Sequence, residues 1–287
     1  MKCLKCEERA VFLDPLLCKK HFIDYFEKKV FVTIKKFDLI KKKDEVVVAC
    51  SGGKDSTSIL YLLKKFHGNV TALAIDEGIM GYRDKTLIDL KSFCKEEKID
   101  LKIYSFKKEF GKTLDSMLKQ KTHPCSVCGT FRRKLLNKCA LGFDKIATGH
   151  NLDDESQAVL MNLLKGNVDL LSHSVPITSK KKGFVQKIKP LYFCSEKEVA
   201  AYALLKKFDV GFTECPYIDE SFRNQVRNSL NNQELKTPGT KLNIVTKHLG
   251  LLKKIKVSDK EFQFCDLCGE PSQGKICKAC QLEKSFK

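Results

Sequence analysis

The chain of 287 residues contains no tryptophan, and none of its apolar runs approaches the roughly 18 residues that a membrane-spanning helix needs. We therefore expect no membrane partner. The sequence opens with Met1-Lys2-Cys3 and continues with polar residues, so we also expect no signal peptide. Because tryptophan is missing, any side chain that stacks on a nucleic-acid base must be phenylalanine, tyrosine, histidine or arginine. These absences together indicate an intracellular protein.

Acidic residues are also scarce relative to basic ones. The chain has 53 lysines and arginines against 35 aspartates and glutamates, which gives a net charge of +18. Such an excess favours a polyanionic partner, because contacts with phosphates release counterions. A lysine-rich solvated surface has the same composition, so charge alone leaves both interpretations open. The hydrophobic fraction of 43% is ordinary for a globular protein, and the length suits one large domain or two modest ones.

The chain has 14 cysteines, and their spacing favours metal sites over disulfide bonds. Near each end there are two short pairs of ligand residues, two cysteine pairs at the C-terminal end and one cysteine pair with one Cys-His pair at the N-terminal end, an arrangement that binds one zinc ion tetrahedrally. The expected ligands are Cys3, Cys6, Cys18 and His21 near the N-terminus and Cys265, Cys268, Cys277 and Cys280 near the C-terminus. A very short segment buries too little core to fold alone, so a metal supplies the missing stability. We expect two Zn²⁺ ions, one in a zinc finger at 1–24 and one in a zinc ribbon at 256–287.

A strand, a polar loop and a helix follow one another near residue 50. The β-branched run at 46–49 leads into Ser51-Gly52-Gly53-Lys54-Asp55-Ser56, and a helical pattern follows. The spacing of a Walker A loop is absent. The two glycines let backbone N–H groups approach a ligand closely, and the helix begins with its positive dipole end at the loop. The stretch therefore predicts a cradle for phosphate groups.

The region at 25–255 alternates strands and helices, and so predicts an α/β fold with a doubly wound parallel sheet of the Rossmann-like kind. The expected strands cover 46–49, 70–75, 101–106, 145–148 and part of 184–191. The expected helices cover 25–44, 54–66, 81–97, 152–164, 196–207 and a last amphipathic stretch ending near 254. Asp76 follows the second strand, so it should lie near the crevice that binds nucleotides in such sheets.

The loop that follows the fourth strand carries Gly149-His150-Asn151-Leu152-Asp153-Asp154. Either aspartate could cap the next helix. Because the loop lies at the carboxyl end of a strand, either could instead bind Mg²⁺ or contact a nucleotide. We interpret His150 as a positioned loop histidine.

A further C-x-x-C pair, Cys125 and Cys128, stands alone in the middle of the chain. It precedes an expected helix that opens with the cations at 132–134, and these charges should lower the thiol pKa values. The pair could be half a zinc site, a redox pair or ligands of a cluster. A third cysteine, Cys215, comes much later. Three other cysteines are interpreted as small buried hydrophobic residues, namely Cys94, Cys139 and Cys194.

The loop at 51–56 resembles the PP-loop of the ATP pyrophosphatases, which cleave ATP between the α and β phosphates. Taken together, the motifs resemble one group of that family, the tRNA 2-thiouridine synthetases. The matching pieces are the N-terminal zinc module, residues 51–56, Pro124-Cys125-x-x-Cys128-Gly129, residues 148–154, Cys215-Pro216, Pro238-Gly239-Thr240-Lys241 and the C-terminal ribbon. The resemblance implies that ATP adenylates the C2 oxygen of a tRNA uridine and that a sulfur nucleophile then displaces AMP.

The resemblance also implies roles for individual residues. The residues expected to bind ATP are Cys50 (through its backbone), Ser51, Gly52, Gly53, Lys54, Asp55, Ser56, Asp76, Gly149 and Asp154. The catalytic residues expected are Lys54, Arg132, Asp154, Cys125, Cys128 and Cys215, and Asp153 is a candidate Mg²⁺ ligand. The three cysteines match ligands of a 4Fe-4S cluster, in which one iron without a cysteine could bind hydrosulfide.

Several alternatives stay open at the level of the sequence. The same cysteines could act through a persulfide and a resolving disulfide. A PP-loop ligase acting on another acceptor and a non-catalytic zinc-dependent RNA-binding protein are the rival functions. The sulfur donor could be a ubiquitin-like carrier protein or free sulfide, and the target could be the wobble uridine or a T-loop uridine. The resemblance implies a cytoplasmic enzyme with tRNA as partner and a homodimeric state.

Overall fold

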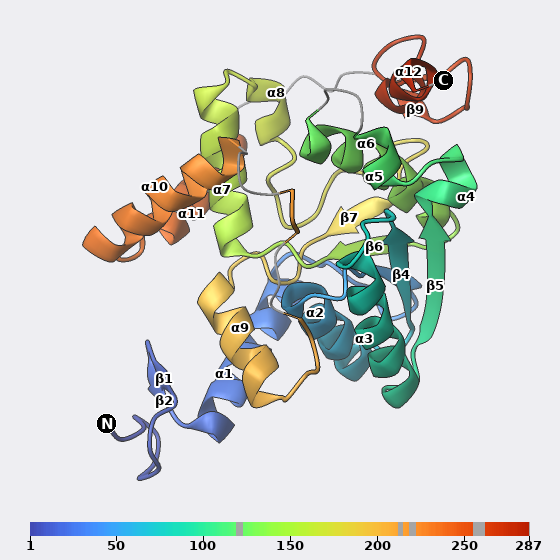
Figure 1. Ribbon diagram of the computed structural model, residues 1–287. Helices are drawn as coiled ribbons and strands as arrows, with labels where there is room; N and C mark the ends of the chain where they lie inside the picture. Colours follow the sequence, from blue (N-terminus) through green and yellow to red (C-terminus); the bar gives the residue numbers. More distant parts are fainter. Residues whose placement is uncertain (119–122, 212–214, 218–221, 255–261, 287) are drawn as a thin grey trace.

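A computed structural model describes residues 1–118, 123–211, 215–217, 222–254 and 262–286 (Figure 1). The predicted boundary at 255/256 between the catalytic region and the C-terminal module lies outside these ranges.

The central sheet has five parallel strands in the order β5-β4-β3-β6-β7. The strands are β3 (Val46–Ala49), β4 (Val70–Asp76), β5 (Asp100–Ser105), β6 (Lys145–Thr148) and β7 (Gln186–Ile188). The predicted doubly wound parallel sheet is confirmed. Some strand boundaries differ, because β4 includes Asp76 and β5 begins at Asp100. The Ser105 side chain caps a helix that begins at Phe106, so Phe106 is helical and not the last residue of β5. The strand order reverses between β3 and β6, which opens a crevice at their carboxyl ends.

Helices cover both faces of this sheet (Figure 1). One face packs against α1 (Lys19–Lys36), α2 (Lys54–Phe66), α3 (Arg83–Glu96) and α9 (Glu196–Leu205), whose apolar residues form the largest buried cluster. The other face packs against α6 (Pro124–Ala140), and α4 (Phe106–Phe110) and α5 (Leu114–Met117) join its cluster. Burying apolar side chains on both faces accounts for the nearly continuous hydrophobic run of β3.

A second helical layer stands beside the carboxyl edge of the sheet. There α7 (Leu152–Leu164) packs against α8 (Val168–Leu171), α10 (Phe222–Lys236) and α11 (Thr240–Leu252). Figure 1 shows this group on the left of the molecule. The helix α11 begins within the segment 238–241, because Gly239 takes φ +90° and lets the chain enter a helix at once.

The two cysteine-rich modules lie at opposite ends of the molecule (Figure 1). The first holds β1 (Phe12–Leu13) and β2 (Leu16–Leu17), and the second holds β8 (Gln263–Phe264), β9 (Pro271–Ser272) and α12 (Lys278–Ser285). The helix α1 was expected at 25–44 but begins at Lys19, so it crosses the predicted boundary at residue 24. One continuous helix therefore leads from the N-terminal module into the main core, and residues of both belong to the same buried cluster.

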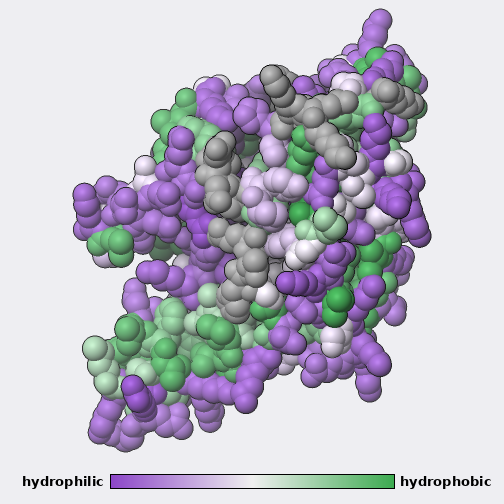
Figure 2. Space-filling view, viewed as in Figure 1, coloured by the Kyte–Doolittle hydropathy of each residue, from purple (hydrophilic) through white to green (hydrophobic). Residues whose placement is uncertain are grey.

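The surface is mostly hydrophilic on the face shown in Figure 2, with a hydrophobic area over the N-terminal module and its neighbours. Leu4 and Leu13 of that module are largely exposed. None of the helices in the described part of the chain combines the length and the apolarity that crossing a membrane requires.

Candidate active site

The loop predicted to hold phosphates lies between β3 and α2, at the carboxyl edge of the sheet. Gly52 takes the left-handed conformation, with φ +82°, and a Cβ atom there would lie 2.3 Å from the carbonyl oxygen of Thr86. Gly53 is extended and leads into Lys54, the first residue of α2. The Ser56 hydroxyl donates to the Gly53 carbonyl oxygen at 3.1 Å. The loop thus closes tightly in front of a helix N-terminus, where phosphate oxygens are favoured.

Cys50, just before the loop, and Asp76, at the end of β4, each have a hydrogen-bond partner close in the sequence. The Cys50 thiol is buried and donates to the Val48 carbonyl oxygen at 3.3 Å, so its backbone alone faces the loop. The Asp76 carboxylate accepts from the N–H of Gly78 at 2.9 Å. Asp76 therefore ends β4 at the same edge of the sheet as the loop.

The loop after β6 packs directly against the start of α2. A Cβ atom at Gly149 would lie 2.9 Å from both the carbonyl carbon of Asp55 and the nitrogen of Ser56. The side-chain amide of Asn151 donates to Asp55 at 2.9 Å. Asn151 also caps α7 in a reciprocal pair with Asp154. The structure therefore brings together the two loops that the sequence singled out, at the point where the strand order reverses.

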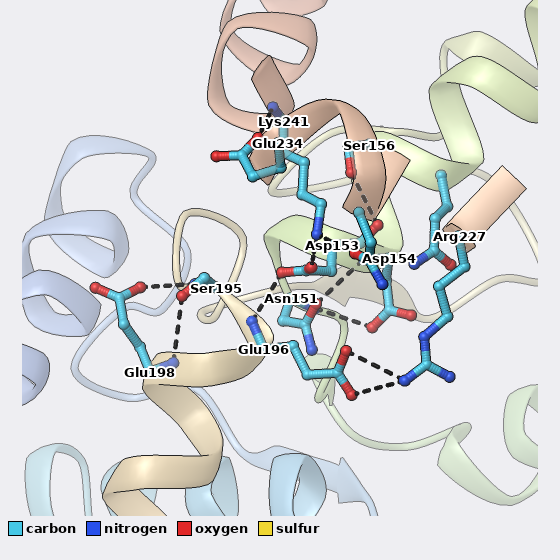
Figure 3. Close-up of polar contacts among 12 residues, drawn as sticks. Asn151, Asp153, Asp154, Ser156, Ser195, Glu196, Glu198, Arg227, Glu234 and Lys241 are labelled. Atoms are coloured by element: carbon cyan, nitrogen blue, oxygen red, sulfur yellow. Dashed lines mark hydrogen bonds and ion pairs between the residues drawn. The ribbon is translucent and has the colours of Figure 1, made fainter. Parts of the chain in front are cut away.

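Lys54 lies between two carboxylates. Its Nζ is 2.9 Å from Asp55 Oδ2 and 3.2 Å from Glu196 Oε1. Arg227 Nη2 lies 3.4 Å from the same oxygen of Glu196, as Figure 3 shows. Although burial lowers it, the pKa of Lys54 is raised overall by these two acids. Lys54 therefore stays charged, and Glu196 links it to α10.

Asp153 is engaged on both of its oxygens by protein groups. Lys241 Nζ donates to Oδ1, and the N–H of Glu196 donates to Oδ2 at 2.8 Å (Figure 3). The two side chains of the ion pair are only 9% and 10% exposed. A carboxylate with both oxygens occupied in this way has little capacity left for a metal. The geometry argues against the Mg²⁺ ligand role expected of Asp153 and indicates a role in joining α7, α9 and α11.

Replacing Lys241 by methionine is expected to lower the free energy of unfolding by about 3 kcal/mol, because Asp153 would be left buried without its cation. Urea unfolding of the full chain measures this change. Lys247→Met, at an exposed position of the same helix, is the control and should change stability by less than about 0.5 kcal/mol. A loss for Lys241→Met as small as that of the control would contradict the importance of the pair.

Asp154 is the more exposed of the two acids in this loop, with a side chain that is 34% exposed. Its Oδ1 lies 3.6 Å from Arg223 Nη1, and its Oδ2 accepts from the N–H of Asn151 at 3.2 Å. Burial raises the pKa of Asp154 to about 6, and Arg223 opposes this only in part. A carboxyl group that titrates near neutral pH is suited to accepting a proton from a substrate.

The raised pKa of Asp154 predicts a pH-dependent stability. The folded pKa lies above the value of about 3.9 in an unfolded chain, so the extra stability is present below pH 4 and is lost as the pH rises through about 6. The Asp154→Asn variant keeps an acceptor for the Asn151 N–H. Relative to this variant, the free energy of unfolding of the native protein should fall by about 1 kcal/mol between pH 4 and pH 8. This decrease is smaller than the whole pKa shift would give, because the carboxylate is 34% exposed to solvent. Denaturant unfolding at both pH values measures it, with Asp209→Asn, at an exposed position, as control. An equal pH dependence of native protein and Asp154→Asn would contradict it.

Arg132 is held in place by an acid that the sequence analysis did not single out. Glu77 is buried, and its Oε1 lies 3.6 Å from Arg132 Nη1 while its Oε2 lies 3.0 Å from Arg83 Nε. Arg83 is buried too and also donates to the carbonyl oxygen of Ser51 in the loop at 51–56. One chain of contacts therefore connects the loop to Arg132. Glu77 directly follows Asp76 at the end of β4, and this position could have indicated a site residue. No local pattern indicated that Arg83 would pair with it.

The three central cysteines come together from two distant segments. Cys125 and Cys128 lie inside α6, which begins at Pro124, and not ahead of the helix as expected. The Cys125 thiol donates to the carbonyl oxygen of Tyr217 at 3.4 Å, so the segment of Cys215 packs against the start of α6. Cys125 is exposed, and the other two cysteines are half-buried. Three cysteines are one fewer than the usual four ligands of a 4Fe-4S cluster, so such a cluster held here would have one iron without a cysteine ligand.

The expected lowering of the thiol pKa values is wrong for two of these cysteines. Burial raises the pKa of Cys128 to about 11, because desolvation outweighs the opposing charge of Arg132. Burial also raises the pKa of Cys215. These thiols therefore need a bound cation to become thiolates near neutral pH, which fits ligands of an iron cluster better than free nucleophiles.

The two terminal cysteine sets have the geometry of zinc sites. In each set, the four ligand atoms lie within 4.8 Å of one another. In the first, Cys6 and Cys18 sulfurs are 3.6 Å apart, and in the second, Cys268 and Cys277 sulfurs are 3.8 Å apart. A tetrahedral zinc ion with Zn–S bonds of about 2.3 Å separates two sulfurs by roughly 3.8 Å. The sets Cys3, Cys6, Cys18, His21 and Cys265, Cys268, Cys277, Cys280 thus fit Zn²⁺.

Of the three remaining cysteines, Cys94 and Cys194 are buried in the core as expected, whereas Cys139 is half-buried. No role was expected from the sequence for Glu77, Arg83, Glu196, Arg227 or Lys241. Except for Glu77, which follows Asp76 at a strand end, each acts through a partner from a separate element that its local sequence does not indicate.

Comparison with known proteins identifies this arrangement. Residues 24–234 match the PP-loop domain family. The chain belongs to the PP-loop family. The tRNA-5-methyluridine(54) 2-sulfurtransferase of Pyrococcus horikoshii is 40% identical, over 98% of this chain and 93% of the relative. The cytoplasmic tRNA 2-thiolation protein 1 of Xenopus laevis is 36% identical, over 98% of this chain and 87% of the relative.

A solved structure extends the likeness to three dimensions. The U34-tRNA thiolase NcsA from Methanococcus maripaludis, solved with its 4Fe-4S cluster, has a TM-score of 0.85 and 36% identity, covering 99% of this chain and 96% of that one. The resemblance to the tRNA-thiolating group of PP-loop enzymes is therefore confirmed, along with the fold.

Proposed function

We propose that this PP-loop protein is an ATP-dependent tRNA uridine 2-sulfurtransferase. The observation that carries the proposal is that the loop at 51–56 and the three central cysteines open at one edge of the sheet, joined through Arg83, Glu77 and Arg132. A uridine between them could meet an activated phosphate on one side and a sulfur source on the other. Relatives named as tRNA sulfurtransferases support the same reaction.

In the proposed reaction, the uridine O2 attacks the α-phosphorus of ATP, and pyrophosphate leaves. A sulfur nucleophile then attacks C2, and AMP departs with the former O2. The backbone N–H groups of the loop and Lys54 would hold the phosphates, and an accompanying Mg²⁺ would offset their charge. Arg132 would face the uridine, and Asp154, with its pKa near 6, would accept the N3 proton. ATP would lie over Cys50, Asp55, Ser56, Asp76 and Gly149.

Cys125, Cys128 and Cys215 would hold a 4Fe-4S cluster, whose iron without a cysteine ligand would supply a binding place for the sulfur atom. Two resident Zn²⁺ ions would stabilise the terminal modules. The sulfur donor would be free sulfide or a ubiquitin-like carrier with a C-terminal thiocarboxylate. The persulfide route uses the same cysteines, but it favours low thiol pKa values, which Cys128 and Cys215 lack.

The test uses protein purified without oxygen, with ATP, Mg²⁺, sulfide and unmodified tRNA. We expect AMP and pyrophosphate to form with 2-thiouridine in equal amounts, and mapping of the thiolated nucleotide will distinguish position 34 from position 54. Iron and labile sulfide near four each per chain would support the cluster. An active enzyme holding zinc alone would contradict the cluster and would indicate that sulfide attacks the adenylated C2 directly. Absence of pyrophosphate release with tRNA would contradict the proposed function and favour a non-catalytic zinc-dependent RNA-binding protein.

The proposal places this enzyme in the cytoplasm, in line with the names of its eukaryotic relatives. The homodimeric state is proposed on family resemblance alone, and light scattering of the holoenzyme tests it.

A further inference from the structure

One face of α6 runs along the chain that leads into β7. The Asn137 side-chain amide donates to the Gly183 carbonyl oxygen at 2.8 Å, and its oxygen accepts from the Val185 N–H at 3.1 Å. Arg133 lies one turn before Asn137 on the same face of the helix. It therefore faces the part of the chain that follows Val185, towards the end of α6 that carries Cys125 and Cys128.

Lys187 is the side chain of β7 that meets this face of α6. It pairs in register with Ile146 of β6, which belongs to the cluster packed against α6. The next residue, Ile188, is fully buried in the cluster on the opposite face of the sheet. Since successive side chains of a strand point to opposite faces, Lys187 points towards α6 and Arg133.

These two cations face each other without a carboxylate of their own. Across the described residues, no acid forms an ion pair with Arg133 or Lys187. The nearby acid Glu155 is already paired with Lys189, 2.8 Å away in a buried contact, and Glu77 is paired with Arg132 and Arg83. Burial and the charges of Lys189 and Arg133 lower the pKa of Lys187 to about 8. A bound anion would reduce the electrostatic repulsion between these two positive charges.

We propose that Arg133 and Lys187 bind a backbone phosphate of the tRNA next to the uridine that is thiolated, an inference that rests on the proposed function. A guanidinium and an ammonium group together suit a phosphate, which the first can grip with two hydrogen bonds. Arg133 is exposed and Lys187 half-buried, so an RNA strand can reach both. They are separate from the ATP loop, where Lys54 is paired with Asp55 and Glu196.

The position explains what such a site would do. Arg133 follows Arg132 and lies about one turn beyond Cys128 on α6. Enzymes that modify a base extrude the nucleotide from its stack, at a cost of a few kcal/mol, and must hold it in place. A phosphate fixed by Arg133 and Lys187 would anchor the extruded nucleotide so that its base reaches the space between the cysteines and the ATP loop.

Arg133→Gln and Lys187→Gln in the holoenzyme test the site through the Kd for tRNA at several KCl concentrations. Each change should weaken tRNA binding roughly tenfold and reduce the slope of log Kd against log salt by close to one. The Kd for ATP and the cluster absorption should not change, which shows that the variants are folded. Lys91→Gln, which removes an exposed lysine of α3 on the other side of the sheet, is the matched control and should keep the native tRNA affinity.

A second measurement uses tRNA with one neutral methylphosphonate beside the target uridine. The native enzyme should lose roughly tenfold in affinity for this tRNA, while the Arg133→Gln, Lys187→Gln double variant should lose no more than about twofold. Additive losses would place the phosphate elsewhere and overturn the inference. So would an unchanged tRNA affinity with a raised KM for sulfide, which would assign the cations to the sulfur donor. A native enzyme that neither binds nor thiolates tRNA would overturn the proposed function, and this site with it.

Discussion

Cys125→Ala is expected to lower the rate of tRNA thiolation by roughly a thousandfold or more while leaving tRNA-dependent exchange of pyrophosphate into ATP within about threefold of the native rate. The physical reason is that the two half-reactions use different groups. In the proposed mechanism, adenylation depends on the loop at 51–56, whereas sulfur delivery depends on the thiols at the start of α6. Cys125 is exposed, so its replacement by alanine opens no cavity in the core.

Liquid chromatography of digested tRNA measures the 2-thiouridine, and the anaerobic absorption spectrum measures the cluster. Cys139→Ala is the matched control, because Cys139 lies on the same helix, is half-buried and belongs to none of the proposed sites. It should keep both thiolation and iron. A Cys125→Ala enzyme that thiolates at the native rate would contradict both the cluster and the persulfide mechanisms. Loss of exchange as well would show that the cysteines also shape the ATP site.

Gly52→Ala is expected to weaken ATP binding at least roughly a hundredfold and so to abolish thiolation. The added Cβ would lie 2.3 Å from the Thr86 carbonyl oxygen, and the backbone would have to keep φ at +82°. The loop cannot move aside freely, because Arg83 holds the carbonyl oxygen of the preceding Ser51. A distortion costing about 3 kcal/mol corresponds to a hundredfold loss in affinity.

Calorimetric titration with ATP measures this effect. Gly68→Ala is the control, because Gly68 has a similar φ of +87° but no atom within 4 Å of the new Cβ. It should cost about 1 kcal/mol of stability through backbone strain alone and should bind ATP normally. If Gly52→Ala bound ATP as tightly as Gly68→Ala does, the loop would not be the ATP site.

Much of the fold followed from local patterns. The sequence predicted the parallel sheet, the alternation of strands and helices and the turn between β3 and α2, because a buried strand, a Gly-Gly turn and an amphipathic helix each have their own period and composition. The errors lay at boundaries. Pro124 is a good first residue of a helix, and this signal could have placed the C-x-x-C pair inside α6. The early start of α1 at Lys19 had no comparable signal.

Local sequence patterns could not predict which charged side chains pair with one another in the site. Asp153 looked like a metal ligand until Lys241, 88 residues away, was found against it. Cys128 looked like a low-pKa thiol because Arg132 follows it, yet burial decides its pKa in the opposite direction. Desolvation depends on what packs over a group, and this is known only once the chain has folded.

The sequence by itself determined which chemical groups this protein carries: the Ser51–Ser56 loop, the two terminal cysteine-rich sets, and the three central cysteines, because each has a characteristic spacing along the chain. Only the tertiary structure decided which charges neutralise one another. Lys54 is paired with Glu196 and Arg132 with Glu77, while Arg133 and Lys187 are left facing each other. The physical reason is that spacing along the chain is a local property, whereas the partner and the burial of a charge are set by contacts between distant elements.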